Sequence, residues 1–403
     1  MNEKLNILVK ADTQGRGIAV EENNRLVEYY RESGDEDTLV NAVFLGKVDR
    51  VMKGLEAAFV KIGQPKSGFL PVKEMDSFEQ TAAQDKISAG SQVIVQVKKD
   101  AKGDKGAYLS RDIALPGRYV IFMPFNRHVG VSERVGDERQ RNALAETGKK
   151  LTNMEFGIIM RNTAVGQSEN VLREDLDALR LRWITIRERA EHAKAPELLY
   201  REDSMLSILV RDYAARYDVS ITCNDRVNRM PAATVGLMWE QIDNKAMDAL
   251  WAKHTVEQQL STALSRHVPL KSGGTLTVDE REALTTIDVN SGSFTARENA
   301  AYQLNLSACS EIAAQIRLRN LSGIILIDFV DMDQDEHRAQ VITALRNYLT
   351  RERQKTVIHG FTSLGLLEMT RKRTGVTLRD RLKEPCGVCG GTGYKRKGNK
   401  TLA

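Results

Sequence analysis

Two aspartates, Asp288 and Asp328, each end a short run of apolar residues and could together bind a metal cation. An ionised carboxylate at the end of a buried strand is costly to desolvate unless a cation or a partner compensates its charge. Because side chains alternate faces along a strand, Asn290 is expected on the same face as Asp288. The same counting puts Asp331 on the face opposite Asp328 if that strand continues so far. We therefore predict a hydrolytic metal site at Asp288 and Asp328, with Asn290 as a polar neighbour that orients it.

The segment between the two aspartates predicts one amphipathic helix over 299–320. Its apolar residues recur four apart, which forms a single helical stripe: Ala300, Leu304, Ala308, Ile312 and Ile316. A strand–helix–strand crossover is right-handed and sets its two strands parallel. Both acidic strand ends should then emerge at the same sheet edge, where open α/β sheets bind their ligands.

The donor atoms of this pair favour a hard cation. Carboxylates without a nearby histidine or cysteine suit Mg²⁺, with Mn²⁺ as a second possibility, better than Zn²⁺. Such an ion polarises a phosphoryl oxygen and lowers the pKa of a bound water. The alternative is that both acids are ordinary strand-end residues paired with Arg or Lys, and local sequence alone leaves the two readings open.

A second candidate metal site lies near the C-terminus, where Cys386 and Cys389 form a glycine-rich knuckle. Glycine lets the backbone turn so that both sulfurs can face one ion. A structural zinc takes four ligands, and this region offers two. Either Zn²⁺ recruits the same pair from a second subunit, or the two cysteines are a redox or vestigial pair. Cys223 and Cys309 are isolated and are expected to serve packing.

Length and composition indicate a multidomain protein with an anionic partner. The chain has 403 residues, an apolar fraction of 41% and a formal net charge of +5, so more than one core is expected. A moderate basic excess is compatible with nucleic acid. The sequence contains no apolar run long enough to span a membrane and no secretory signal at its N-terminus. We therefore expect a cytoplasmic protein.

Short strands between about 38 and 111, punctuated by glycine-rich turns, predict a small β-barrel. Leu39–Phe44 and Lys47–Met52 are expected as two of its strands. In barrels of the OB type, exposed aromatic side chains stack bases while lysines follow the RNA backbone. The aromatic candidates are Phe59 and Phe69, and the basic ones are Lys47, Lys61 and Lys105. Spacing alone leaves open whether both phenylalanines belong to the core instead.

The remaining chain predicts mixed α/β structure. Residues 17–30 are expected to form one strand after a turn at 15–17. Strands and charged helices alternate from about 112 to 206, and Pro196 ends the long helix that begins near Glu169. Residues 243–267 are expected to form one further helix.

Taken together, these stretches resemble the ribonuclease E/G family, and most closely its ribonuclease G branch, over almost the whole chain. The motifs that carry the resemblance are Gly54–Val60 with Gly68–Pro71, Leu270–Gly274, Thr286–Asn290, Leu318–Leu321, Ile327–Met332, Gly365–Arg371 and the cysteine knuckle.

The resemblance implies an α/β multidomain fold. An RNase H-like domain is split by an inserted OB-type (S1) β-barrel and a 5′-sensor, and is followed by a DNase I-like α/β catalytic domain and a zinc-link. The implied boundaries are 1–36 and 207–264 for the RNase H-like parts, 37–111 for the S1 domain, 112–206 for the sensor region, 265–381 for the catalytic domain and 382–403 for the zinc-link with its basic tail.

The resemblance also implies a Mg²⁺-dependent endoribonuclease. It would cleave single-stranded, AU-rich RNA, in ribosomal RNA precursors and mRNA, and leave 5′-phosphate and 3′-hydroxyl ends. The implied residues are Asp288 and Asp328 on Mg²⁺, Asn290 orienting the site, and Phe59, Phe69 and Lys105 on RNA. Cys386 and Cys389 would join two protomers through one Zn²⁺. The alternative is a non-catalytic RNA-binding or assembly protein that keeps the barrel but has lost turnover.

The chain departs from the family pattern in three places. The implied 5′-monophosphate sensor comprises Arg161, Asn162, Gly117, Arg134 and Lys355. Asn162 stands where the family has threonine, and a second sensor arginine maps onto either Glu133 or Arg134, of which a glutamate would repel a terminal phosphate. Gly387 replaces a common proline in the knuckle. The sequence ends at Ala403, before a small domain of longer members that helps to pair dimers, so we expect a homodimer rather than a tetramer.

Overall fold

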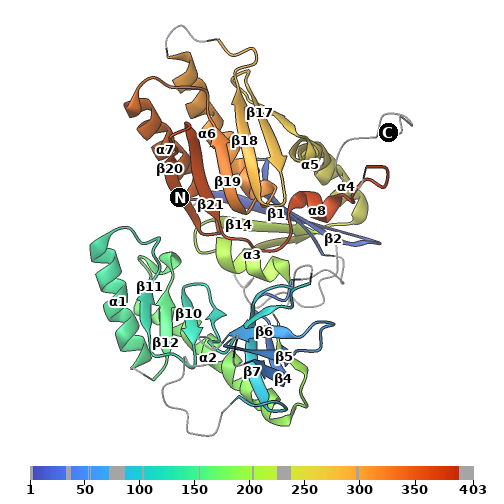
Figure 1. The fold of residues 1–403 in the computed structure, drawn as a ribbon, viewed down its shortest axis with the longest axis vertical. Helices are drawn as coiled ribbons and strands as arrows, with labels where there is room; N and C mark the ends of the chain where they lie inside the picture. Colours follow the sequence, from blue (N-terminus) through green and yellow to red (C-terminus); the bar gives the residue numbers. More distant parts are fainter. Residues whose placement is uncertain are drawn as a thin grey trace. The chain divides into compact units, whose positions relative to one another are not determined.

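The computed structural model describes residues 3–32, 38–52, 54, 56–71, 87–101, 104–153, 155–201, 204–224, 237–295 and 299–389 (Figure 1). The chain divides into two units. The first comprises Met1–Leu5, Glu32–Ser220 and Arg226–Trp239, and the second comprises Asn6–Arg31, Ile221–Asp225 and Glu240–Ala403. The basic segment that follows Cys389 lies outside the described residues.

Five strands of the first unit close into a barrel. They are β4 (Val43–Met52), β5 (Ala57–Lys61), β6 (Gly68–Pro71), β7 (Gln92–Lys99) and β8 (Tyr108–Ser110). Their order is β4-β5-β6-β8-β7, and a pairing of β4 with β7 closes the ring. Alternate residues of these strands, such as Ala58, Val60 and Leu70, fill the interior. The sequence therefore predicted the barrel correctly.

The first barrel strand differs from its prediction, because one strand replaces two. The N-terminal part of β4 pairs with β7, and its C-terminal part, from Lys47 onward, pairs with β5. A strand that passes from one neighbour to the next in this way closes a small barrel. A register shift between Val48 and Arg50 marks the irregularity.

The rest of the first unit is a four-stranded sheet with helices. The sheet contains β9 (Leu115–Pro116), β10 (Val120–Met123), β11 (Val129–Val131) and β12 (Gly157–Met160). The helices are α1 (Glu138–Thr152), the short η3 (Asn162–Ala164), α2 (Glu169–His192) and α3 (Met205–Tyr213). Strand β13 (Glu197–Tyr200) pairs with β4 at the barrel. One core joins this sheet to α2 through Leu172, Leu176 and Trp183.

A five-stranded sheet comprises β1 (Lys4–Asp12), β2 (Gly15–Glu22), β3 (Arg25–Glu32), β14 (Asp218–Cys223) and β15 (Met238–Gln241). Residues 17–30 thus form parts of two strands, because Asn23 and Asn24 make a turn with φ of 52° and 61°. Asn tolerates this left-handed region, which two-residue hairpins require.

Helices α4 (Asn244–Lys253) and α5 (Val256–Leu264) replace the single predicted helix and pack on this sheet through Trp251 and Leu260. Thr255, with φ of 50°, separates them. A β-branched residue in this conformation breaks a helix.

The C-terminal sheet has six strands in the order β16-β17-β18-β19-β21-β20. Their bounds are His267–Pro269, Thr275–Glu280, Leu284–Asn290, Gly323–Asp328, Leu366–Arg371 and Thr356–Phe361 respectively. Helices α6 (Ala300–Leu318) and α7 (Asp335–Leu349) cover one face of this sheet (Figure 1), and the short α8 (Leu378–Leu382) follows it.

The crossover between the two aspartates follows its prediction. Strands β18 and β19 pair in parallel, and α6 connects them. Four members of the predicted helical stripe are buried, while Ala300 at the first turn is exposed. None of the described helices is long and apolar enough to span a membrane.

Candidate functional site

Asp288 and Asp328 are direct neighbours on the face of the sheet that α6 and α7 leave open. The register pairs Asp288 with Asp328. The residues before them, Ile287 and Ile327, are fully buried in the core under the helices. By strand alternation the aspartates face the other way, and accordingly Asp288 is half-buried and Asp328 exposed. The crossover thus places two carboxylates side by side at the carboxyl ends of adjacent strands.

A short hydrogen-bond chain orients Asp288. The side-chain amide of Asn290 donates to Asp288 Oδ2 at 2.7 Å and, more weakly, to Thr277 Oγ1 at 3.4 Å. Thr277 is the register partner of Asp288 on β17, and its hydroxyl lies 3.3 Å from His267 Nδ1. Asn290 therefore holds one carboxylate in place. Thr277 and His267 escaped the sequence analysis because their contribution depends on the β17–β18 register.

The position of Asp331 does not follow from strand alternation. Strand β19 ends at Asp328, so alternation no longer governs the position of Asp331. Burial, together with the neighbouring charges of Asp288 and then Asp331, raises the pKa of the Asp328 carboxyl. Asp331 is thus close enough to add to the negative field at the pair.

The donor set fits a divalent hard cation. The charged groups that act on Asp328 are both acidic, and within the described ranges neither Asp288 nor Asp328 forms an ion pair with Lys or Arg. This geometry disfavours the reading of two ordinary strand-end salt bridges. In the part of the chain that the structure describes, His, Cys, Asp and Glu do not gather in threes or more to form a metal cluster. The protein would therefore supply two carboxylates and leave the remaining positions to water and substrate, as is usual for Mg²⁺.

On the barrel, five side chains form one continuous row across all five strands. Register pairs Arg50 with Phe59, Phe59 with Phe69, Phe69 with Tyr108, and Tyr108 with Lys99. The Arg50 guanidinium lies 4.7 Å from the Phe59 ring centre, and Lys99 Nζ lies 5.5 Å from that of Tyr108. We call these five residues the aromatic row.

The aromatic row lies on the barrel surface. Phe59 and Phe69 are half-buried and meet edge to face at 5.9 Å, while Phe69 and Tyr108 lie 6.1 Å apart. Neither phenylalanine belongs to the barrel core, which decides the alternative that spacing left open. Sequence reasoning missed Tyr108, Arg50 and Lys99, because the pairing of residues across strands decides which side chains belong to the aromatic row.

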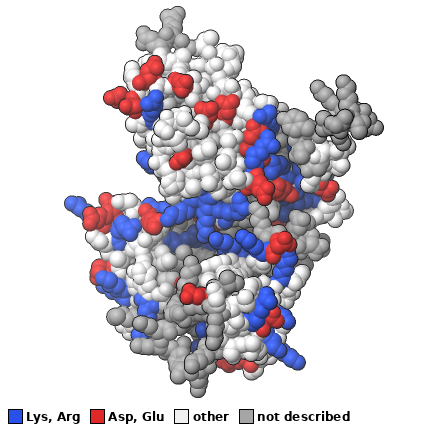
Figure 2. Space-filling view, in the orientation of Figure 1, with Lys and Arg blue, Asp and Glu red and all other residues white. Residues whose placement is uncertain are grey.

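The predicted lysines lie on the same barrel. Lys47 and Lys61 are register partners at the β4–β5 pairing, and Lys61 forms an ion pair with Asp49 at 3.0 Å. Lys105 is exposed just before β8. Figure 2 shows that Lys and Arg side chains gather on parts of one face instead of spreading evenly over it.

Arg161, the central residue of the predicted sensor, is held by two partners. Its Nη2 atom forms an ion pair with Asp212 at 2.9 Å, and Nη1 donates to the Gly117 carbonyl. Asn162 begins η3 and is half-buried. The adjacent Thr163 does not replace the missing threonine, because its buried hydroxyl donates to the Arg118 carbonyl at 2.6 Å.

The loop after Gly117 is fixed from within the fold. The Asp175 carboxylate accepts hydrogen bonds from the backbone N–H groups of Arg118, Tyr119 and Val120 at 2.7–3.0 Å. A Cβ atom at Gly117 would come within 2.6 Å of Asp175 Oδ2. Glycine is therefore required here for close approach of the carboxylate.

The other predicted sensor residues have no described contact with Arg161 or Gly117. Glu133 and Arg134 lie in an exposed turn before α1. Lys355 is exposed before β20 and belongs to the second unit, whereas Arg161 and Gly117 belong to the first. The structure thus brings Arg161 and Gly117 together.

The cysteines fall into two classes. Cys386 is exposed and Cys389 half-buried, whereas Cys223 and Cys309 are buried. Burial raises the pKa of the Cys309 thiol to about 12, so it is an inert packing residue. The two knuckle sulfurs are the pair available to a shared metal.

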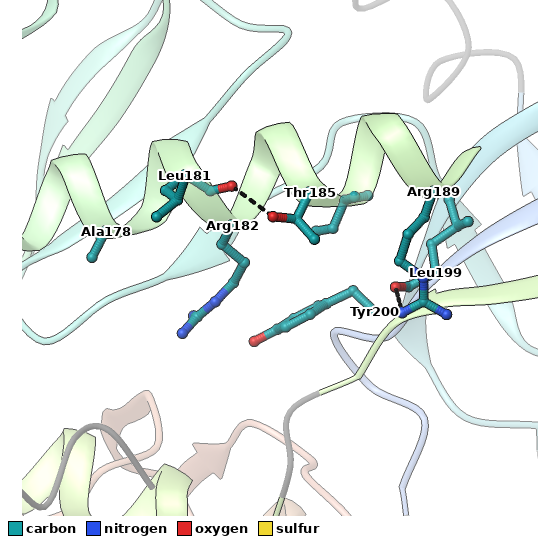
Figure 3. A pocket seen from close by; sticks show the side chains of 8 residues that line it. Ala178, Leu181, Arg182, Thr185, Arg189, Leu199 and Tyr200 are labelled. Carbon is teal, nitrogen blue, oxygen red and sulfur yellow. Dashed lines mark hydrogen bonds between the residues drawn. The ribbon is translucent and has the colours of Figure 1, made fainter. Parts of the chain in front are cut away.

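A shallow hollow of about 320 Å³ lies between α2 and β13 (Figure 3). Arg182 points across it, with its guanidinium 5.4 Å from the Tyr200 ring centre, and Arg189 donates to the Leu199 carbonyl. None of the predicted site residues lines this hollow. It therefore contributes nothing to the proposed chemistry.

Comparison with known proteins identifies relatives along the whole chain. Residues 114–374 match the model of the Ribonuclease E/G family, and residues 39–112 match that of the S1 RNA binding domain. Ribonuclease G of Haemophilus influenzae is 34% identical over 412 residues, covering 97% of this chain and 84% of that protein. Ribonuclease G of Escherichia coli is 34% identical over 409 residues, with 96% and 83% covered. Ribonuclease E of a Nostoc species is 34% identical over 402 residues, with 94% and 58% covered.

Proposed function

The chain belongs to the ribonuclease E/G family and is an endoribonuclease of RNA processing, and we propose that it cleaves single-stranded RNA with Mg²⁺ held by Asp288 and Asp328. The observation that supports this proposal is the in-register pairing of the two carboxylates on an open sheet face. In this reading, the six-stranded sheet is the DNase I-like catalytic domain, and the five-stranded sheet with α4 and α5 is the RNase H-like domain.

The division of labour in the site follows from its contacts. Asp288 and Asp328 would hold the cation, and Asn290 fixes the Asp288 carboxylate through the 2.7 Å hydrogen bond. A bound Mg²⁺ (or Mn²⁺) would supply polarisation of the scissile phosphate and a lowered pKa of a water. The open face of the sheet leaves room for an extended strand of RNA. The products would carry 5′-phosphate and 3′-hydroxyl ends.

Single-strand preference follows from the aromatic row. Phe59, Phe69 and Tyr108 offer ring faces to unpaired bases, and Arg50 and Lys99 supply positive charge at both ends of the row. Stacking requires bases that are not already paired. AU-rich stretches pair weakly and so present such bases most readily. Unpaired segments of ribosomal RNA precursors and mRNA are the substrates we propose.

A 5′-monophosphate on the RNA would stimulate cleavage through Arg161. This guanidinium is already oriented by Asp212 and the Gly117 carbonyl, and guanidinium groups bind phosphate strongly. The Asn162 side chain can add a hydrogen bond. Arg134 is the further residue of the first unit that we propose for the sensor.

A homodimer with one shared Zn²⁺ would complete the assembly. The exposed Cys386 and half-buried Cys389 supply two thiolates, and the same pair from a second copy would supply the other two. This arrangement satisfies the tetrahedral site that structural zinc requires.

Single-turnover cleavage of a 5′-monophosphorylated, AU-rich oligoribonucleotide tests the catalytic assignment. We expect Asp288→Ala and Asp328→Ala each to slow cleavage by roughly 1,000-fold, because each removes a ligand of a cation that supplies several kcal/mol of charge stabilisation. Asp335→Asn changes an acid whose side chain is 90% exposed and serves as the matched control. Unchanged rates in both alanine variants would refute the assignment.

A further inference from the structure

The end of α3 carries a guanidinium that the proposed sensor does not use. Arg216 follows α3, where its backbone N–H donates to the Tyr213 carbonyl at 2.9 Å. The residue is half-buried. Among the described residues, its side chain has no hydrogen-bond or ion-pair partner. A partly desolvated cation without a partner is costly, so Arg216 requires an explanation.

Arg216 follows Asp212, the ion-pair partner of Arg161, by four residues. The backbone bonds from Ala214 N–H to the Val210 carbonyl and from Tyr217 N–H to the Tyr213 carbonyl continue the helical spacing over this stretch, so Asp212 and Arg216 lie on the same side of it. Burial, together with the positive charge of Arg161, lowers the pKa of Arg216, and Asp212 acts on it in the opposite direction. The Asp212 carboxylate already accepts from two other guanidiniums, Arg161 at 2.9 Å and Arg211 at 3.1 Å. Two arginine side chains therefore contact the Asp212 carboxylate, and Arg216 is influenced by its charge without pairing with it.

Asp175 on α2 is committed to backbone groups. The Asp175 carboxylate receives three backbone N–H groups from residues 118–120. The Arg118 guanidinium donates to the carbonyl of Ala214, two residues before Arg216. Arg216 is thus an unpaired guanidinium close to the one that we propose for phosphate binding. A phosphate monoester, with close to two negative charges, can accept hydrogen bonds from two guanidiniums at once.

We propose that Arg216 is a second guanidinium of the 5′-phosphate site and binds the terminal phosphate of RNA together with Arg161. The inference rests on the proposed 5′-phosphate sensing and adds to it a residue outside the predicted set. It also accounts for Asn162, because a second cation can replace the hydrogen bond that a threonine would supply.

The test compares binding of one fluorescent oligoribonucleotide in 5′-monophosphate and 5′-hydroxyl forms, without added Mg²⁺. We expect Arg216→Gln to lower the affinity ratio between the two forms roughly tenfold, as for one lost hydrogen bond to a charged group. Arg216→Lys should retain part of the ratio. Arg173→Gln, which changes an exposed arginine of α2 that pairs with Glu169, should leave it unchanged.

A stability measurement separates binding from folding. In the absence of RNA, Arg216→Gln should unfold at the same temperature as the wild type or a higher one, because no partner is lost. An unchanged affinity ratio, or an equal loss for both RNA forms, would overturn the inference. A wild-type protein that cleaves RNA but binds both forms equally would overturn it as well. Failure of wild-type cleavage with Mg²⁺ would instead refute the proposed function.

Discussion

At the residue scale, the aspartate pair that we propose as the catalytic centre holds two like charges side by side. Asp288 and Asp328 occupy the same register position on adjacent strands, and the pKa of Asp328 is raised by burial and by its acidic neighbours. Such a pair costs stability in the metal-free protein, because the Asp288 charge opposes ionisation of Asp328. The cation that permits chemistry would also relieve this repulsion.

Replacing one of the two acids should therefore separate stability from function. We expect Asp288→Asn to raise the melting temperature of the metal-free protein or leave it unchanged, and to abolish the increase that Mg²⁺ produces in the wild type. Thermal unfolding with and without Mg²⁺ measures both effects. A Mg²⁺-dependent increase equal to that of the wild type would contradict the assignment of Asp288 as a ligand.

Glu21 on β2 predicts a pH dependence of stability. It is fully buried, and its Oε2 atom lies 2.6 Å from His254 Nδ1. Burial raises the pKa of Glu21, with His254 opposing the shift. A folded-state pKa above the unfolded value means that this contribution to stability is full at acidic pH and is lost as pH rises through the folded pKa. Glu21→Gln, which cannot ionise, should flatten the fall in unfolding free energy as the pH rises above about 4.5. Urea unfolding at a series of pH values measures this free energy. An equal dependence on pH in the wild type and in Glu21→Gln would disprove the prediction.

At the scale of elements, the register of the barrel strands brings residues that are distant in sequence into the aromatic row, which we propose to bind RNA. Tyr108 lies between Phe69 and Lys99 in that row. Tyr108→Ala should weaken binding of single-stranded RNA by about tenfold, because stacking on one aromatic ring contributes roughly 1–3 kcal/mol. Fluorescence anisotropy measures this loss. The control Tyr348→Ala removes a tyrosine of α7 that is 46% exposed, and an equal loss there would argue against a specific role of the row.

The sequence predicted correctly the arrangement of elements that follow one another directly along the chain. One amphipathic helix between two apolar strands fixes a parallel crossover, which is why Asp288 and Asp328 could be paired before the structure was known. Asp331 could not be placed, because strand alternation holds only as far as the strand continues. Arg50 and Tyr108 could not be found either, since closure of a barrel sets a register that no single strand encodes.

Turns and helix breaks were the second source of error. The turn at Asn23 and Asn24 and the break at Thr255 each depend on a residue with positive φ. The apolar pattern continues through both positions. Periodicity alone therefore predicts one strand over 17–30 and one helix over 243–267, where the structure has two of each.

At the scale of the whole molecule, the two proposed activities belong to different units. The aspartate pair belongs to the second unit, and the aromatic row and Arg161 belong to the first. RNA binding by the aromatic row and cleavage at the aspartates are therefore proposed for different parts of the chain. The dimer proposed through the knuckle cysteines would give each assembly two copies of this arrangement.

The cysteines permit a direct count of accessible thiols. We expect two of the four to react rapidly with a thiol reagent in the native protein, because Cys223 and Cys309 are buried while the knuckle pair is accessible. The Cys309 thiol, with its pKa raised to about 12, stays protonated and unreactive at neutral pH. Added Zn²⁺ should protect the knuckle pair. Rapid reaction of all four thiols in the folded protein would contradict the assignment.

Zinc content and molecular mass test the shared site itself. A metal held by Cys386 and Cys389 from two protomers requires about half a zinc per chain. Cys386→Ser should lower that content and convert the dimer into a monomer, which light scattering coupled to size-exclusion chromatography resolves. Cys223→Ser changes a buried cysteine outside the knuckle and controls for general loss of a thiol. A dimer that persists in Cys386→Ser without zinc would show that other surfaces hold the protomers together. One full zinc per chain would show that each protomer completes its own site.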